Sequence, residues 1–259
     1  MTEEILVKRD GAVMTLTLNR PDKFNALTFG MYTRLAEVCE GVGRDGPVRA
    51  IVLTGAGTKA FAAGTDIAQF RDFKSEQDGI AYEARLDQIL STIERCAVPT
   101  IAAIAGACTG GGAAIAACCD MRIATRDARY GYPIARTLGN CLSAASLQRL
   151  SALMGPARVT DLLFTSRLMS AEECLTAGLV TEIVDDHAAL MVRAETLARQ
   201  IAGHAPLTIS VTKELMRRLR EVDAKVDDHD LVGMIYTSED FREGLEAFLA
   251  KRKPVWRGR

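Results

Sequence analysis

Alternating apolar and polar positions predict the strands of this chain, and helical spacing predicts the segments that join them. Residues 5–20 alternate on either side of Asp10-Gly11, a dipeptide typical of tight hairpins. Short apolar runs predict buried strands at 48–55, 100–107 and 121–125. Amphipathic spacing predicts helices from Thr28, a suitable N-cap, to Gly41–Gly43 and over residues 78–95. Strands that alternate with helices in this way indicate an α/β fold with buried parallel strands.

The pattern changes after about residue 186, where the strand signals stop. Amphipathic spacing predicts three further helices, at 187–203, 207–221 and 238–252. No stretch of flexible composition separates these segments from the preceding chain. We therefore expect an α/β core over residues 1–186 and a helical region over residues 187–259 that completes it.

Composition limits the class of protein. The chain has 259 residues, of which 48% are hydrophobic and 25% charged, which is ample for a buried core. A formal net charge of −1 gives no global field that would recruit nucleic acid or an anionic membrane. The sequence has no apolar run of membrane-spanning length, and its first residues lack the features of a signal peptide. We therefore expect a cytoplasmic protein.

The cysteines and histidines give little support to metal or nucleophilic sites. The seven cysteines are scattered without a C-x-x-C pair, and the three histidines all lie in the second half of the chain. A zinc site, a disulfide framework and a Ser-His-Asp triad therefore lack local support. We expect no bound metal and mostly reduced, buried cysteines.

Two glycine-rich segments, GAGTKA (55–60) and TGGGAA (109–114), follow predicted strands, and three interpretations apply to them. GAGTKA (55–60) matches the weak form of the dinucleotide-binding fingerprint, but residues 61–66 interrupt the helix that should follow. Both segments could instead be simple tight turns. The third interpretation is chemical, because small residues near Thr65 and Gly111 would expose backbone N–H groups, with a helix dipole behind the TGGGAA run. Two such donors that converge on one oxygen form an oxyanion hole.

The order and spacing of several motifs resemble the enoyl-CoA hydratase/isomerase (crotonase) superfamily. The motifs are NRPDKFNAL, IVLTGAGTKAFAAGTDI, PTIAAIAGACTGGGAAIAACCDMRIAT, SAEECLTAGLV and EGLEAFLAKRKPVW. This resemblance covers essentially the whole chain and implies a crotonase-like spiral of repeated β-β-α units with a helical C-terminal trimerisation region. It also implies an acyl-CoA thioester as the small-molecule substrate, and a homotrimer or a hexamer built as a dimer of trimers.

The same resemblance implies roles for particular residues. The amides of Thr65 and Gly111 would hold the thioester oxygen, and preorganised amides can stabilise an enolate without a metal or redox cofactor. No separate cofactor is implied, because CoA enters as part of the substrate. The residues implied to contact the substrate or its CoA moiety are Lys23, Phe24, Ala26, Ala63, Gly64, Thr65, Asp66, Ile67, Gly111, Phe248 and Lys251. Phe248 and Lys251 belong to the C-terminal region that often completes the site of a neighbouring subunit in this family.

The sequence departs from the family pattern at the two positions where hydratases usually carry catalytic glutamates. GGGAAIAACCD places Ala114 at the first position, and YGYPIAR places Ile134 at the second. Positioned acid/base groups typically contribute about 10²–10⁴-fold to a rate. The two replacements therefore leave open which reaction an oxyanion hole would serve.

Other side chains could supply the missing chemistry. Asp66 adjoins the predicted oxyanion donor, although a carboxylate there also suits a helix N-cap. Arg136 could clamp an acyl carboxylate or form a surface ion pair, and Asn140 could orient water or stabilise a turn. The remaining candidates are tyrosines that also suit packing and cysteines without a neighbouring histidine: Tyr130, Tyr132, Cys118, Cys119 and Cys141.

Three functional hypotheses follow. The first is an acyl-CoA lyase or isomerase, for which hydratase is the commonest family activity and isomerase, decarboxylase and hydrolase are the alternatives. The second is an acyl-CoA-binding protein that has lost catalysis, since both usual glutamates are replaced. The third is a nicotinamide-dependent oxidoreductase, based on GAGTKA alone.

Overall fold

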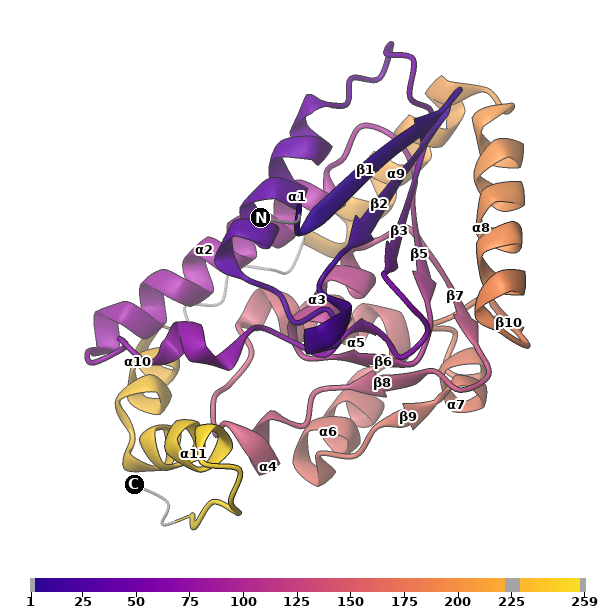
Figure 1. Ribbon diagram of the computed structural model, residues 1–259. Helices are drawn as coiled ribbons and strands as arrows, with labels where there is room; N and C mark the ends of the chain where they lie inside the picture. Colours follow the sequence, from indigo (N-terminus) through magenta and orange to yellow (C-terminus); the bar gives the residue numbers. More distant parts are fainter. Residues whose placement is uncertain (1–2, 222–228, 257–259) are drawn as a thin grey trace.

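The larger of two β-sheets forms the centre of the fold (Figure 1). The computed structural model describes residues 3–221 and 229–256. The larger sheet has the strand order β1 (Ile5–Asp10), β2 (Val13–Leu18), β3 (Ala50–Gly55), β5 (Thr100–Ile104), β7 (Met121–Thr125) and β10 (Glu182–Val184). Strands β1 and β2 form the predicted antiparallel hairpin, in which Asp10 pairs with Val13. The other neighbouring strands of this sheet are parallel.

A smaller sheet lies next to the first and arises from the same repeated units. Its strand order is β4 (Ala60–Ala62), β6 (Ala107–Thr109), β8 (Arg129–Gly131) and β9 (Met169–Ser170). The chain visits the larger sheet and then the smaller one three times in succession, as β3 and β4, β5 and β6, and β7 and β8. This arrangement confirms the predicted α/β spiral.

The sequence analysis predicted a loop throughout residues 55–64, and this prediction was wrong because residues 60–62 form strand β4. Residues 55–60 join β3 to β4 and do not open a helix. The dinucleotide-binding fingerprint requires its glycine-rich turn to lead directly into a helix. The GAGTKA segment therefore lacks the structural context on which the oxidoreductase hypothesis depended.

Both faces of the larger sheet are covered at its central strands β3 and β5. In β3, Ala50 and Val52 pack toward α8 (His187–Ala202), whereas Ile51 and Leu53 pack into the main core. That core includes side chains of α1 (Phe29–Gly41) and α2 (Glu76–Glu94), and Figure 1 shows α1 and α8 on opposite sides of the sheet. Burial on both faces explains why β3 appears in the sequence as a continuous apolar run.

The remaining helical segments surround the two sheets. They are η1 (Pro21–Lys23), η2 (Ile67–Phe70), α3 (Gly111–Cys118), α4 (Ile134–Thr137), α5 (Ala144–Met154), α6 (Pro156–Thr165), α7 (Ala171–Thr176), α9 (Pro206–Glu221), α10 (His229–Thr237) and α11 (Glu239–Leu249). Helix α1 begins as predicted, because the Thr28 side chain accepts the Met31 amide at 3.1 Å. Helices α8, α9 and α11 confirm the three predicted C-terminal helices, whereas α10 was not predicted.

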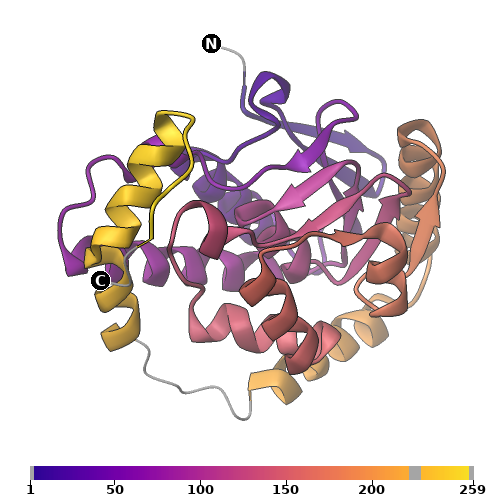
Figure 2. The same cartoon turned by 90° about the horizontal axis from the view of Figure 1, so that it is seen from below.

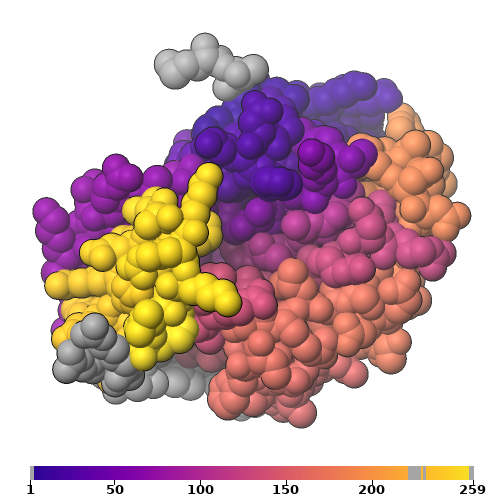
Figure 3. All heavy atoms as spheres, turned by 60° about the horizontal axis from the view of Figure 1, so that its bottom comes forward, coloured from indigo at the N-terminus to yellow at the C-terminus, as the bar shows by residue number. Residues whose placement is uncertain are grey.

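The C-terminal helices return to the first half of the chain. Helix α10 packs against α2 and α11 against η2, and Figure 2 shows α11 close to the α2 region. Phe70, Tyr236 and Phe241 belong to one buried cluster there. In the space-filling view, the yellow C-terminal segment covers one end of the visible face, beside residues coloured purple (Figure 3). Across residues 3–221 and 229–256, none of the helices has both the length and the apolar character of a membrane span.

Candidate active site

Three turns of the spiral bring their loops to one edge of the smaller sheet. Ala62 of β4 pairs with Cys108 of β6, and Thr109 of β6 pairs with Gly131 of β8, in both cases in parallel. Because the carboxyl ends of parallel strands lie at the same edge, the segments 63–66, 110–111 and 132–134 become neighbours. The Gly110 amide donates to the Gly131 carbonyl at 3.0 Å, which joins two of these segments directly.

The segment around Thr65 is held from one side by Leu27. The Leu27 amide donates to the Gly64 carbonyl at 2.8 Å, and the Leu27 carbonyl accepts the Asp66 amide at 2.8 Å. Successive peptide groups of an extended segment point in opposite directions, so the Thr65 amide points away from Leu27. The Thr65 hydroxyl lies 2.9 Å from the Tyr32 hydroxyl and 3.3 Å from that of Tyr82.

Gly111 is the first residue of α3. It follows Gly110, whose φ of 51° lies in the left-handed region that glycine tolerates best. The Ala114 amide donates back to the Gly110 carbonyl at 2.9 Å, which leaves the amides of residues 111–113 without partners inside the helix. The positive end of the helix dipole lies at these amides. A β-carbon on Gly111 would collide with the Tyr32 hydroxyl and lie 2.9 Å from Thr65 Oγ1, so Thr65 and Gly111 are close neighbours.

A cavity of about 160 Å³ lies between these loops, and we call it the central cavity. Its lining includes six residues that the family resemblance had implied: Ala63, Gly64, Thr65, Ile67, Gly111 and Phe248. Ala114 and Ile134, which the family resemblance assigns to the two usual glutamate positions, also line it. Residues of helix α2 and of the loop after Pro133 complete the wall.

The segment implied to contact CoA lies next to this edge. The Ala63 amide donates to the Phe24 carbonyl at 3.0 Å, which places Lys23–Ala26 beside the loop after β4. Asn25 fastens this segment, because its buried side chain donates to the carbonyls of Ala60 at 2.7 Å and Ala56 at 3.0 Å. The sequence analysis did not single out Asn25, although it lies inside the NRPDKFNAL motif.

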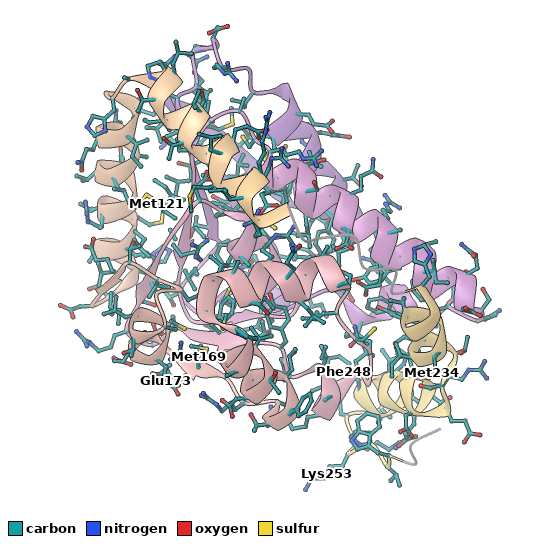
Figure 4. All side chains as sticks on the ribbon, turned by 180° about the vertical axis from the view of Figure 1, so that it is seen from behind. Met121, Met169, Glu173, Met234, Phe248 and Lys253 are labelled. Carbon is teal, nitrogen blue, oxygen red and sulfur yellow. The ribbon has the colours of Figure 1, made fainter. Side chains whose placement is uncertain are left out.

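Three other candidate residues lie outside the described lining of the central cavity. Asp66 caps η2 by accepting the Ala68 amide at 3.2 Å, and it forms an ion pair with Arg20 at 3.0 Å. Its side chain therefore has the capping role that the sequence analysis gave as the alternative to a base. Arg136 and Lys251 are exposed. Phe248, in contrast, lines the cavity of its own chain from the end of α11 (Figure 4).

The tyrosine and cysteine candidates are mostly packing residues. The Tyr130 hydroxyl donates to the Ala113 carbonyl at 3.0 Å, and its ring packs edge-to-face on Tyr132, which lines the cavity. Burial raises the pKa of both phenols above their usual value, so both stay protonated at neutral pH. Burial likewise raises the pKa of Cys118 and Cys119 to about 12, which makes these thiols poor nucleophiles.

Cys141 and Asn140 also line the central cavity. The Cys141 side chain is half-buried. The Asn140 Oδ1 atom is enclosed and lacks a hydrogen-bond partner within the described part of the chain. An enclosed carbonyl oxygen of this kind is an acceptor that a ligand hydroxyl or amide can satisfy.

Sequence reasoning missed one functional candidate, Glu83. Its helix α2 is amphipathic, and nothing in the spacing marked this glutamate as buried, yet it is only 6% exposed and lines the central cavity. The Tyr236 hydroxyl donates to Glu83 Oε1 at 2.6 Å. Tyr236 belongs to α10, the helix that was not predicted, so no sequence signal could have paired the two residues. In the described lining Glu83 is the sole carboxylate, and none of the side chains is Lys, Arg or His.

Comparisons with known proteins agree with this architecture. The family model for enoyl-CoA hydratase/isomerase matches residues 8–259. A short-chain-enoyl-CoA hydratase from Clostridium acetobutylicum is 32% identical over 252 residues, which cover 96% of this chain and 95% of that protein. The chain therefore belongs to the enoyl-CoA hydratase/isomerase family.

Solved structures of the same fold include more than one activity. An enoyl-CoA hydratase/carnithine racemase from Magnetospirillum magneticum is 35% identical, with a TM-score of 0.79 over 100% of this chain and 97% of that one. A methylmalonyl-CoA decarboxylase in complex with 2-nitronate-propionyl-CoA is 27% identical, with a TM-score of 0.90 and full coverage of both chains. The family and fold are thus clear, whereas these relatives catalyse different reactions.

Proposed function

We propose that this protein binds an acyl-CoA thioester in the central cavity and stabilises its enolate with the amides of Thr65 and Gly111. The observation that carries the proposal is the meeting of the two segments at one cavity wall, where only glycine fits at position 111. A thioester enolate concentrates negative charge on one oxygen. Fixed N–H donors stabilise that charge without reorganising, and the loss of one donor of this kind costs about 10²–10³-fold in rate.

The residues around the proposed oxyanion hole favour isomerisation over hydration. Hydration of an α,β-unsaturated thioester needs one group to activate water and another to protonate the α-carbon. Ala114 and Ile134 line the cavity and can move no proton. A double-bond shift needs an enolate and only one proton carrier. We therefore propose an enoyl-CoA isomerase reaction within the enoyl-CoA hydratase/isomerase family.

A decarboxylase is the second candidate, because a solved decarboxylase has a closely similar fold. The methylmalonyl-CoA decarboxylase structure superposes with a TM-score of 0.90, against 0.79 for the hydratase/racemase structure. Loss of CO₂ from an α-carboxyl thioester also forms an enolate and needs no base to remove a proton. The apolar side chains of Ala114 and Ile134 are compatible with this chemistry.

Three substrates tested in parallel separate these reactions. Purified protein is offered 3-hexenoyl-CoA, crotonyl-CoA and methylmalonyl-CoA, and the products are resolved by chromatography. We expect conversion of 3-hexenoyl-CoA to its 2-enoyl isomer, with little hydration of crotonyl-CoA. Release of CO₂ alone would identify the protein as a decarboxylase. Hydration of crotonyl-CoA alone would identify it as a hydratase, the commonest activity of the family. Tight thioester binding without turnover would leave a binding protein and reject the proposed enzyme.

A paired substitution tests whether the ancestral hydratase geometry survives. In Ala114→Glu with Ile134→Glu, both usual carboxylates return to the cavity wall. We expect crotonyl-CoA hydration to rise well above the wild-type rate only in the double variant, because the two groups act together. Either single variant serves as the matched control. Equal hydration by the wild-type protein would show that these positions are not the limiting feature.

We also propose that the chain assembles as a homotrimer or as a dimer of trimers, and that CoA passes along Lys23–Ala26. Supporting the first point, α9 carries an exposed apolar stripe at a spacing of four residues: Leu207, Val211, Leu215 and Leu219. An exposed stripe of this kind marks an interaction surface. Analytical ultracentrifugation tests the assembly, and a monomer at micromolar concentration would reject it.

A further inference from the structure

Glu83 is a buried carboxylate on the wall of the central cavity. Burying a carboxylate is costly unless it is hydrogen-bonded, and the cost is tolerated most often where the charge has a function. One contact that orients it is the hydrogen bond from the Tyr236 hydroxyl, which lies 2.6 Å from Oε1. A neutral glutamine at position 83 could accept that bond equally well. The bond from Tyr236 by itself therefore does not require a charge at this position.

The position of Glu83 relates it to the proposed oxyanion hole. It follows Tyr82 in α2, and the Tyr82 hydroxyl lies 3.3 Å from Thr65 Oγ1. Both side chains line the same cavity as Thr65 and Gly111. The negative charge of Glu83 also adds to the effect of burial in raising the pKa of Tyr32, whose hydroxyl occupies the space above Gly111.

We propose that Glu83 is the catalytic carboxylate of this enzyme and carries one proton between two carbons of an unsaturated acyl-CoA. This inference rests on the proposed enolate chemistry and deepens it, because it assigns the acid/base role that Ala114 and Ile134 cannot fill. Tyr236 is then a positioning residue, since its hydroxyl holds the carboxylate in one orientation. In this proposal Glu83, which belongs to helix α2, performs the acid/base role of both usual glutamates.

The proposed step is balanced without a co-reactant. The Glu83 carboxylate removes a proton from the α-carbon of a 3-enoyl thioester, and the electron pair of the broken C–H bond becomes a dienolate. The amides of Thr65 and Gly111 hold its charged oxygen. Protonated Glu83 then delivers a proton to the γ-carbon, the double bond moves to the 2-position, and the carboxylate is regenerated. The overall change is an isomerisation with no net oxidation or reduction.

The charge of Glu83 also restricts the substrate class. No Lys, Arg or His side chain occurs among the described residues of the cavity lining, so the lining offers no cationic side chain to pair with a carboxylate on the acyl group. A substrate with a carboxylate on its acyl group would meet like-charge repulsion from Glu83 at this wall of the cavity. The structure therefore favours a neutral unsaturated acyl group and disfavours the decarboxylase candidate.

Deuterium exchange tests the assignment without assuming the final product. Butyryl-CoA is incubated with protein in D₂O, and loss of the α-proton signal is followed by proton NMR, alongside isomerisation of 3-hexenoyl-CoA. We expect Glu83→Gln to lower both rates by about 10²–10⁴-fold, with butyryl-CoA affinity changed less than threefold. The matched control is Glu76→Gln, which alters an exposed glutamate of the same helix, beside Gly233 of α10 and outside the described lining. This control should keep wild-type rates.

Two further variants keep the test informative if Glu83→Gln folds poorly. Glu83→Asp retains the charge but withdraws the carboxylate by one methylene, and we expect at least a tenfold loss of exchange. Tyr236→Phe should lower kcat several-fold, leave KM nearly unchanged and move the acid limb of the pH–rate profile upward, because the charged carboxylate loses a donor. A purely structural tyrosine would leave that limb in place.

The possible outcomes distinguish the proposed role of Glu83 from the proposed enolate stabilisation on which it rests. Wild-type exchange that survives both Glu83→Gln and Glu83→Asp would overturn the role of Glu83 while leaving enolate stabilisation intact. Absence of exchange and turnover in the wild-type protein would overturn both proposals. Exchange lost in the Glu83 variants and kept in Glu76→Gln is the supporting result.

Discussion

Gly111→Ala perturbs the proposed oxyanion hole with the smallest possible change. The added β-carbon would collide with the Tyr32 hydroxyl and lie 2.9 Å from Thr65 Oγ1 and 3.1 Å from Tyr32 Cζ. Alanine is otherwise favoured over glycine in a helix by about 1 kcal/mol. The cost of the substitution is therefore steric and falls on the two residues around the proposed donor.

The expected magnitudes differ for stability and for activity. Overpacking of this kind costs about 1–3 kcal/mol, which corresponds to a fall in Tm of roughly 2–10 °C for a chain of this size. Moving one oxyanion donor out of position costs about 10²–10³-fold in kcat. We expect the loss of kcat to be the larger effect, since moderate destabilisation leaves nearly all of the protein folded at 25 °C.

The assay combines thermal unfolding with isomerisation of 3-hexenoyl-CoA. Gly41→Ala at the end of α1 is the matched control, because a β-carbon there meets no atom within 4 Å, and it should leave kcat unchanged without lowering Tm. Adding Tyr32→Phe removes the oxygen in the collision, so the double variant should unfold at a higher temperature than additivity predicts. Wild-type kcat and Tm in Gly111→Ala would refute the assignment of this residue.

Three further predictions follow from other contacts. Tyr82 and Leu86 separate the central cavity from a second cavity of about 200 Å³ between α1 and α2. Tyr82→Ala should therefore join the two cavities and lower the KM for longer acyl chains, which a C4–C12 acyl-CoA series would measure. Glu94→Gln should lower stability by about 3–5 kcal/mol in urea unfolding, because it leaves the buried Arg149 guanidinium, now 3.2 Å from Glu94, without its carboxylate. Cys118, with its pKa raised by burial to about 12, should resist iodoacetamide at pH 8 until the protein is unfolded, as mass spectrometry of the labelled peptides would show.

Local signals in the sequence accounted for many of the secondary-structure elements. The hairpin was predicted correctly, although its turn lies at Gly11-Ala12 and not at Asp10-Gly11, because Gly11 adopts the positive φ and Asp10 still pairs in β1. Thr28 caps α1 through an amide three positions away. The apolar runs of β3 and β5 could be recognised in the sequence because these two strands are buried on both faces. The short strand β4 could not be predicted from the sequence, because three residues carry too little pattern to distinguish a strand from a loop.

The proposed oxyanion residues were found by motif, whereas their meeting was decided by topology. Thr65 and Gly111 lie on different turns of the spiral, and the parallel pairing of β4 with β6 brings their loops to one edge. The same pairing places Ala114 and Ile134 in the cavity, so the sequence could show that the usual glutamates are missing but not what replaces them.

The sequence by itself determined the family and the strand and helix order of the α/β core, and it led us to expect apolar residues at the two usual glutamate positions. Only the tertiary structure decided that Glu83 faces the central cavity and that Tyr236 holds it, from 153 positions further along the chain. Helical periodicity marks which face of α2 is polar, but a contact with α10 depends on how the C-terminal region folds back. A pattern within one helix carries no information about that long-range packing.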